Sequence, residues 1–167
     1  MSGLGLKVSK KLALRTSFEA NVITYSSAIS ACEKGEQWQW ALQLFAELFD
    51  RRLSANRITY TSTISACEKG GRWDWALHFM KELQKSTLKC NVISYYAALR
   101  ACESQSQWQQ ALEVFRQLEE SKLQGNILTY ASALSACEEV HHPNFSRLLK
   151  DLEETFYGLL RAKRLHR

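Results

Sequence analysis

Four of the five cysteines are spaced 35 residues apart, and their sulfur atoms could in principle bind a metal ion. These are Cys32, Cys67, Cys102 and Cys137. Zinc sites cluster their ligands locally, whereas this sequence has no Cys-x-x-Cys pair, and the adjacent His141 and His142 form too small a set. We therefore expect no metal and no other cofactor. Cysteines in this pattern are typical of small buried residues in a reducing compartment.

The tryptophans could stack against nucleic-acid bases, but their spacing favours a structural role. Trp38, Trp73 and Trp108 are also 35 residues apart, and each begins a stretch whose apolar residues recur every three or four positions. That period places the three rings on the apolar face of a helix. We interpret them as packing residues.

Catalytic and membrane-spanning functions find no support in this sequence. It has no nucleophile–base pair, glycine-rich phosphate loop or paired-carboxylate motif. No apolar run approaches the roughly 20 residues that span a bilayer. Hydrophobic residues make up 46% of the 167 residues, which is enough for a core. We expect a soluble, folded protein that is not an enzyme, has no small-molecule substrate and does not enter a membrane.

The cysteines and tryptophans belong to a repeat of 35 residues. Its copies begin with similar pentapeptides at Asn21, Asn56, Asn91 and Asn126. Laying residues 21–55 on residues 56–90 without a gap gives 19 identities, and such self-similarity is the signature of a repeat architecture. We predict repeats over 21–55, 56–90 and 91–125, a divergent repeat or capping unit over 126–160, and a basic tail over 161–167.

Each repeat has the pattern of two helices joined by a tight turn. In the first repeat, residues 24–33 have apolar positions at helical spacing. Gly35 follows, and glycine just past a helix end favours a stop because it tolerates left-handed backbone angles. A second helix over 38–50 has its apolar residues on one face. Neither helix buries that face alone, so the hairpins must stack into an all-α solenoid.

The order of residues within the repeat resembles the pentatricopeptide repeat. The segment Ile-Ser-Ala-Cys-Glu-Lys-Gly at 29–35 and 64–70 is similar to algal members of that family. The tetratricopeptide repeat does not fit, because its period is about 34 residues and its tryptophan comes early. The resemblance covers about 21–160, although Ala55 and Cys90 replace a proline that is frequent in the family. It implies a right-handed superhelix that binds single-stranded RNA with one repeat per nucleotide.

The resemblance also implies which residues read the bases. In the family, this is done by the residue after the tyrosine of the first helix together with the residue that closes the repeat, which here is the asparagine numbered as the start of the next repeat. The pairs here are Ser26 with Asn56, Thr61 with Asn91, and Tyr96 with Asn126. A small hydroxyl residue with asparagine is the family's adenine combination, so the first two repeats are expected to prefer adenine. The third pair lies outside the usual combinations.

Two further sets of residues carry over from the family. The aliphatic residue two positions before the tyrosine lies between successive bases, and here these residues are Ile23, Ile58, Ile93 and Leu128. Lys34 and Lys69 match a position near the RNA phosphates. Ser104 and Glu139 take that position in the later repeats, which predicts weaker binding toward the C-terminal end.

Each of these residues also has a structural interpretation. The asparagines could be helix N-caps, a role that is compatible with base reading. Ser26 and Thr61 could simply be solvated near the start of a helix. The isoleucines could form a core between repeats.

The net charge of +5 is concentrated at the two ends of the chain. Residues 1–20 carry +3 and residues 161–167 carry +4, which leaves −2 for the repeats. The array is therefore not expected to attract phosphates uniformly.

Residues 1–20 are interpreted either as part of a preceding repeat or as a transit-like segment, because they are basic with apolar residues between the charges. Family membership favours a chloroplast or mitochondrion. Three functional hypotheses stay open. The first is sequence-selective binding of single-stranded RNA that supports organelle RNA processing, stability or translation. The others are a scaffold for protein partners and a fragment of a longer RNA-binding array.

Overall fold

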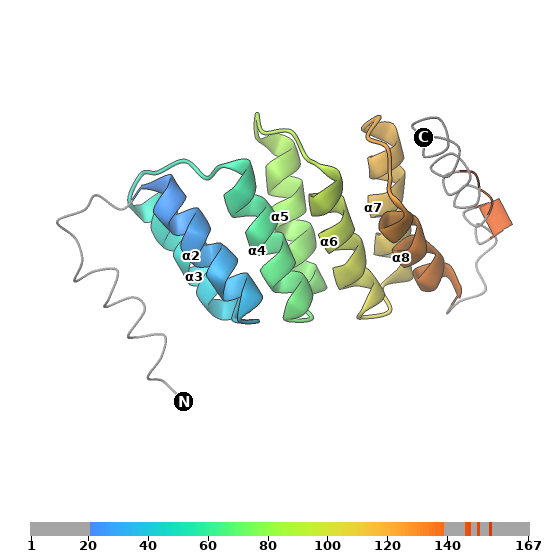
Figure 1. Ribbon diagram of the computed structural model, residues 1–167, viewed down its shortest axis with the longest axis horizontal. Helices are drawn as coiled ribbons and strands as arrows, with labels where there is room; N and C mark the ends of the chain where they lie inside the picture. The colour runs from blue at the N-terminus through green and yellow to red at the C-terminus, as the bar shows by residue number, and fades with distance from the viewer. Residues whose placement is uncertain (1–20, 139–145, 148–149, 151–153, 155–167) are drawn as a thin grey trace, which may run out of the picture.

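The computed structural model describes residues 21–138, 146, 147, 150 and 154, and this part contains seven continuous helices and no strand (Figure 1). The first helices of the repeats are α2 (Val22–Lys34), α4 (Arg57–Lys69), α6 (Val92–Glu103) and α8 (Ile127–Glu138). The second helices are α3 (Trp38–Asp50), α5 (Trp73–Lys85) and α7 (Trp108–Glu120). The predicted all-α fold of stacked hairpins is confirmed. Residues 1–20, most of the capping unit after α8, and the tail 161–167 lie outside the described residues.

The hairpins stand side by side in chain order, with the first helices in one layer and the second helices in another (Figure 1). The first helices contact one another along the whole array, from α2 through α4 and α6 to α8, whereas α3 and α5, like α5 and α7, have little or no direct contact. Small buried residues such as Ser62, Ala66, Ala98 and Ala101 line the first helices, which lets their backbones approach closely. We therefore assign the first helices to the inner face of the array.

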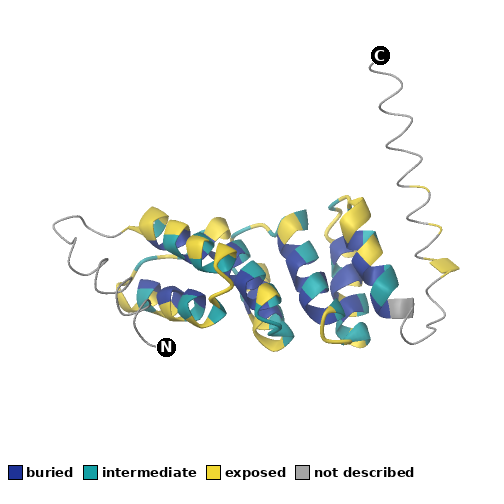
Figure 2. Ribbon diagram, turned by 60° about the horizontal axis from the view of Figure 1, so that its bottom comes forward, coloured by how far each residue is buried: buried dark blue, intermediate teal, exposed yellow. Residues whose placement is uncertain are grey.

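The core lies between the helices of each hairpin and between successive hairpins (Figure 2). In the first repeat, Ala41, Leu44, Phe45 and Leu48 of α3 are buried against Tyr25 and Ile29 of α2, as the period of apolar residues predicts. The three repeated tryptophans are partly buried and pack against this core, so the interpretation of them as packing residues is confirmed. No helix in the described part of the chain is long and apolar enough to cross a membrane.

The turns after α2, α4 and α6 are Schellman turns, and the role that we predicted for the glycine is wrong in detail. Gly35 and Gly70 have φ near −89° and −82°, and the left-handed residue is the next one, Glu36 or Gly71. The turn closes because the residue after that donates its N–H to the carbonyl five residues back, as Gln37 does to the Cys32 carbonyl at 2.9 Å. Gly70 is required for space instead, since a Cβ there would lie 2.2 Å from Cδ1 of Trp38.

Candidate nucleic-acid interface

The predicted base-sandwiching residues form a row of exposed aliphatic side chains at the start of the first helices. Ile23 is 70% exposed, Ile58 60%, Ile93 62% and Leu128 53%. Each is the second residue of its helix, so the row follows one edge of the inner layer. The alternative that these residues form a core between repeats is therefore wrong. Exposed aliphatic side chains at a constant interval are suited to contact a regularly spaced ligand.

A cleft of about 390 Å³ is lined by members of all three predicted groups of RNA-binding residues: base-sandwiching, base-reading and phosphate-proximal. Ile23 and Ile58 line it from the starts of α2 and α4, and Ser26 and Asn56 belong to it as well. Lys34, the last residue of α2, also lines the cleft. The aliphatic residues, the predicted reading pair and the predicted phosphate-proximal lysine of the first repeat thus share one cavity.

The hydroxyl of Ser26 is buried and lies within a hydrogen-bond network that joins the first two repeats. Its oxygen is 2.8 Å from the Val22 carbonyl, 3.4 Å from Oδ1 of Asn56 and 2.9 Å from the hydroxyl of Thr59. The alternative that Ser26 is solvated is therefore wrong. A serine has a single hydroxyl hydrogen, and three protein acceptors lie within its reach. We infer that this hydrogen stays within the protein and that only the oxygen lone pairs can serve a ligand.

The asparagine at each junction between repeats is the N-cap of the first helix that follows it. Oδ1 of Asn56 accepts from the backbone N–H and the hydroxyl of Thr59, both at 2.9 Å. Asn21, Asn91 and Asn126 accept from the backbone N–H three residues on in the same way. Because Oδ1 is committed to the cap, Asn56 can offer a ligand only its amide NH₂, which has no hydrogen-bond partner among the described residues. The cap interpretation is confirmed, and it leaves the NH₂ group for recognition.

The second and third reading pairs are arranged differently from the first. The hydroxyl of Thr61 is buried and has no hydrogen-bond partner in the described part of the chain. In the cap of this repeat, the Ser94 hydroxyl donates to the Asn91 carbonyl at 2.8 Å and does not reach Thr61. Tyr96 is half-buried and Asn126 is exposed. Only the first predicted pair, Ser26 with Asn56, is joined by a hydrogen bond.

The two predicted phosphate-proximal lysines differ in their electrostatic surroundings. Lys34 is exposed and has no ion pair within the described residues. Nζ of Lys69 lies 3.3 Å from the carboxylate of Glu33 in the preceding repeat. In the third repeat Ser104 is exposed at this position, and Glu139 of the fourth lies outside the described residues. Sequence reasoning missed the Glu33 contact, although the repeat places an acidic residue one position before each lysine.

A further ion-pair cluster on the first-helix layer was also not predicted. Arg100 lies 3.8 Å from Glu68 of the preceding repeat and 3.4 Å from Glu103 of its own helix. Arg100 replaces the serines found at this position in the first two repeats, Ser30 and Ser65. Two cations of this layer, Lys69 and Arg100, are therefore paired with glutamates of the same layer.

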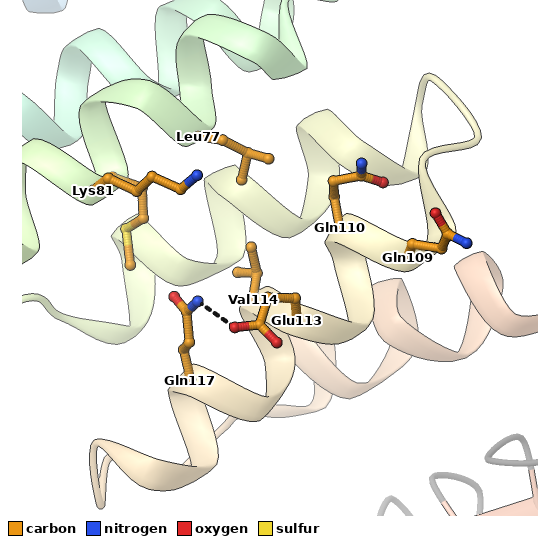
Figure 3. Close-up of a pocket in the computed structure, with 8 residues that line it drawn as sticks. Leu77, Lys81, Gln109, Gln110, Glu113, Val114 and Gln117 are labelled. Atoms are coloured by element: carbon orange, nitrogen blue, oxygen red, sulfur yellow. Dashed lines mark hydrogen bonds between the residues drawn. The ribbon is translucent and has the colours of Figure 1, made fainter.

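A separate cleft of about 260 Å³ lies in the layer of second helices, between α5 and α7 (Figure 3). Leu77 and Val114 supply apolar surface, Lys81 of α5 adds a positive charge, and Glu113 of α7 accepts a hydrogen bond from Gln117 at 2.8 Å (Figure 3). Hydrogen bonds from Arg116 and Gln117 lower the pKa of Glu113 to about 2, so this carboxylate is charged at neutral pH and is a weak proton acceptor.

The cysteines of the described residues are placed as the sequence predicts for packing residues. Cys67 and Cys102 are fully buried, and burial raises the pKa of each thiol to about 12. Cys32 and Cys90 are half-buried, and burial raises their pKa as well. No group of three or more potential metal ligands occurs within the described part. The side chain of Cys137 and both paired histidines lie outside it.

These features define the class of the protein: an α-solenoid of 35-residue hairpins whose inner face has polar clefts between aliphatic side chains. A family profile described as the pentatricopeptide repeat domain matches residues 11–70 and 78–139, and one described as the PPR repeat matches residues 58–88. The chain belongs to the pentatricopeptide repeat family. A comparison with curated protein sequences finds no significant match.

Solved structures of this family share the fold. The PPR domain of Arabidopsis thaliana protein-only RNase P 1, in complex with tRNA, has a TM-score of 0.79 at 16% identity, over 90% of this chain and 79% of that chain. Nuclear proteinaceous RNase P 2 from A. thaliana has a TM-score of 0.76 at 15% identity, over 88% and 34%. The protein PPR10, in complex with an 18-nt psaJ RNA element, has a TM-score of 0.70 at 19% identity, over 92% and 23%. The chain thus spans about a quarter of the length of PPR10.

Proposed function

We propose that this protein binds single-stranded RNA along the inner face of its array and prefers adenine at the first two repeats. The observation that carries the proposal is the cleft of the first repeat, which Ser26 and Asn56 line together with the exposed side chains of Ile23 and Ile58. A flat base fits between two aliphatic side chains, and unstacked bases are what sequence-specific RNA-binding proteins read. Family membership and the likeness to RNA-bound pentatricopeptide repeat structures support the same function.

The hydrogen-bond polarity of the cleft supports the preference for adenine. Asn56 offers a donor, its NH₂ group, and Ser26 offers an acceptor, its oxygen lone pairs. All four Watson–Crick edges place an acceptor beside a donor, and the bases differ in which of the two is the ring nitrogen. In the orientation that we propose, the Asn56 NH₂ group faces the ring nitrogen, which is an acceptor in adenine and cytosine and a donor in guanine and uracil. This orientation favours adenine and cytosine, and the family combination favours adenine of the two.

The charge distribution supports a binding mode that depends more on bases than on phosphates. The repeats carry a net charge of −2, and Lys69 is paired with Glu33. Each lost phosphate contact reduces the dependence of binding on salt. We therefore expect modest affinity and weak salt dependence for this array. The finer role, support of organelle RNA processing, stability or translation, extends this proposal and rests on the family resemblance.

Titration of fluorescently labelled RNA tests the proposal. We expect single-stranded oligo(A) to bind more tightly than oligo(U), by about 30-fold when two repeats each discriminate by about 1 kcal/mol. Duplex RNA of the same length is the control, because its bases are paired and cannot enter the cleft. Equal binding of oligo(A), oligo(U) and duplex would overturn the proposal.

A protein scaffold is the second candidate function, and the cleft between α5 and α7 is the observation that favours it. This cleft lies on the layer of second helices and combines an apolar floor with amide and charged groups at its rim (Figure 3). Its separation from the first-helix layer allows an RNA and a protein partner to bind together. A partner that is retained after nuclease treatment and lost in Lys81→Glu, a change at an exposed residue of this cleft, would support this function, and retention in that variant would oppose it.

A further inference from the structure

A second cleft adjoins the base-reading cleft of the first repeat. It has a volume of about 420 Å³ and is lined by the start of α4 and by the segment between α5 and α6. The lining residues are Asn56, Arg57, Ile58, Thr87, Leu88 and Lys89. Two of them, Asn56 and Ile58, also line the cleft that holds Ser26. A ligand that contacts Asn56 in the first cleft therefore lies next to the second.

Arg57 and Lys89 give the second cleft two positive charges without a carboxylate partner in the described part of the chain. Both side chains belong to exposed residues. Most other basic residues of the array differ in this respect, since Lys69, Arg72 and Arg100 each lie within 4.0 Å of a carboxylate. The cleft also lies at the N-terminal end of the 13-residue helix α4, where the helix dipole favours negative charge.

The two basic residues are not needed for the fold of the repeat. The equivalent positions hold Val22 and Ser54 in the first repeat, and Val92 and Gln124 in the third. These repeats form the same hairpin and the same asparagine cap without a basic pair. Arg57 and Lys89 are therefore a feature of the second repeat alone.

We propose that Arg57 and Lys89 form a phosphate subsite, which binds the RNA backbone beside the nucleotide whose base is read at Asn56. This inference rests on the proposed function. An arginine binds a phosphate through two parallel N–H donors, and a lysine adds a point charge. Together with Lys34 in the adjoining cleft, the subsite gives the two clefts three cations without an ion pair among the described residues. It concentrates phosphate binding at that point of an array whose repeats are acidic overall.

The salt dependence of RNA binding tests this subsite in the full chain. The variant Arg57→Val with Lys89→Gln carries the residues of the third repeat, so it is expected to fold. We expect the slope of log affinity against log salt to decrease by about 1.4, which is about 0.7 for each of two lost phosphate contacts on a single strand. The preference for oligo(A) over oligo(U) should be unchanged. The control Lys81→Gln with Lys85→Gln removes the same charge from α5 and should leave the slope at the wild-type value.

The outcomes separate this inference from the proposed function. An unchanged slope in the Arg57→Val, Lys89→Gln variant, with selective RNA binding intact, would overturn the subsite alone. If the wild-type protein binds no RNA, the proposed function fails. An NMR titration with inorganic pyrophosphate then tests whether Arg57 and Lys89 bind an anion. Chemical-shift changes at the amides of Arg57 and Ile58 that disappear in the variant would support an anion site. Their absence would overturn it.

Discussion

The hydroxyl oxygens of Ser26 and Thr59 lie 2.9 Å apart, which joins the predicted reading position of one repeat to the helix cap of the next. Thr59 also donates to Oδ1 of Asn56 at 2.9 Å and accepts from its backbone N–H at 3.2 Å. The orientation of the Asn56 amide is thus fixed from both repeats. Its NH₂ group is held in place before any ligand binds, which reduces the entropy that recognition would cost.

Thr59→Val should reduce the free energy of unfolding by about 1–2 kcal/mol, because it removes one half of a capping box and leaves a buried Ser26 hydroxyl with fewer partners. The measurement is urea denaturation followed by circular dichroism. Thr24→Val is the matched control in the first repeat, where Thr24 is exposed and its hydroxyl contacts only Asn21, at 3.2 Å. Equal losses in the two variants would contradict the importance of the link between repeats.

Thr61→Val should leave the free energy of unfolding unchanged or raise it by about 1 kcal/mol, because the hydroxyl that it removes is buried without a partner. The same change should weaken base discrimination at the second repeat, if that hydroxyl turns toward a bound base. Thr61→Ser keeps the hydroxyl and should keep the discrimination. A loss of stability in Thr61→Val would show that the hydroxyl has a partner in solution.

Gly70→Ala should destabilise the protein by about 1–3 kcal/mol, since the new Cβ would lie 2.2 Å from Trp38 of the preceding repeat. Gly35 occupies the same position one repeat earlier, and the nearest atom to a Cβ there is the Ala31 carbonyl oxygen at 3.4 Å. Gly35→Ala should therefore be close to neutral. Thermal unfolding of both variants measures the difference, and similar melting temperatures would contradict the close packing of Trp38.

The buried thiols predict a loss of stability at alkaline pH. The pKa of Cys67 and Cys102 is about 12 in the folded protein, against an ordinary value of 9.0. The folded state thus retains protons that the unfolded chain releases, so this contribution is complete below pH 9 and is lost as the pH rises toward 12. Denaturation at several pH values measures it. Cys67→Ala with Cys102→Ala should flatten the alkaline decline, and an unchanged decline would assign it to other groups such as Tyr25, whose pKa is also raised to about 12.

The fold was predictable from the sequence because its signals are local and repeated. The 35-residue period, the apolar stripe that begins at Trp38 and the asparagine caps each depend on residues within one hairpin. The predicted helix over 38–50 agrees with α3, and the predicted helix over 24–33 lacks only the first two residues and the final lysine of α2.

The details of the candidate site depend on contacts between repeats, which the period does not encode. The ion pair of Lys69 with Glu33 and the link of Ser26 to Thr59 both join residues in neighbouring repeats. The repeat makes Ser26 and Thr61 equivalent positions, yet only the Ser26 hydroxyl has hydrogen-bond partners. The reason lies in the next helix cap: the Thr59 hydroxyl reaches back to Ser26, whereas that of Ser94, the equivalent residue one repeat later, donates to its own cap. Such contacts between repeats depend on the orientation of each side chain, which the spacing of residues in the sequence does not determine.

Reversing the hydrogen-bond polarity of the reading positions tests the central claim most directly. Asn56→Asp with Asn91→Asp keeps both helix caps, because aspartate caps a helix as well as asparagine does, but it replaces a donor by an acceptor. Competition between labelled oligo(A) and oligo(U) should then show a preference for adenine in the wild-type protein and for uracil in the variant. The same base preference in both proteins, with folding intact by circular dichroism, would contradict base reading at these positions.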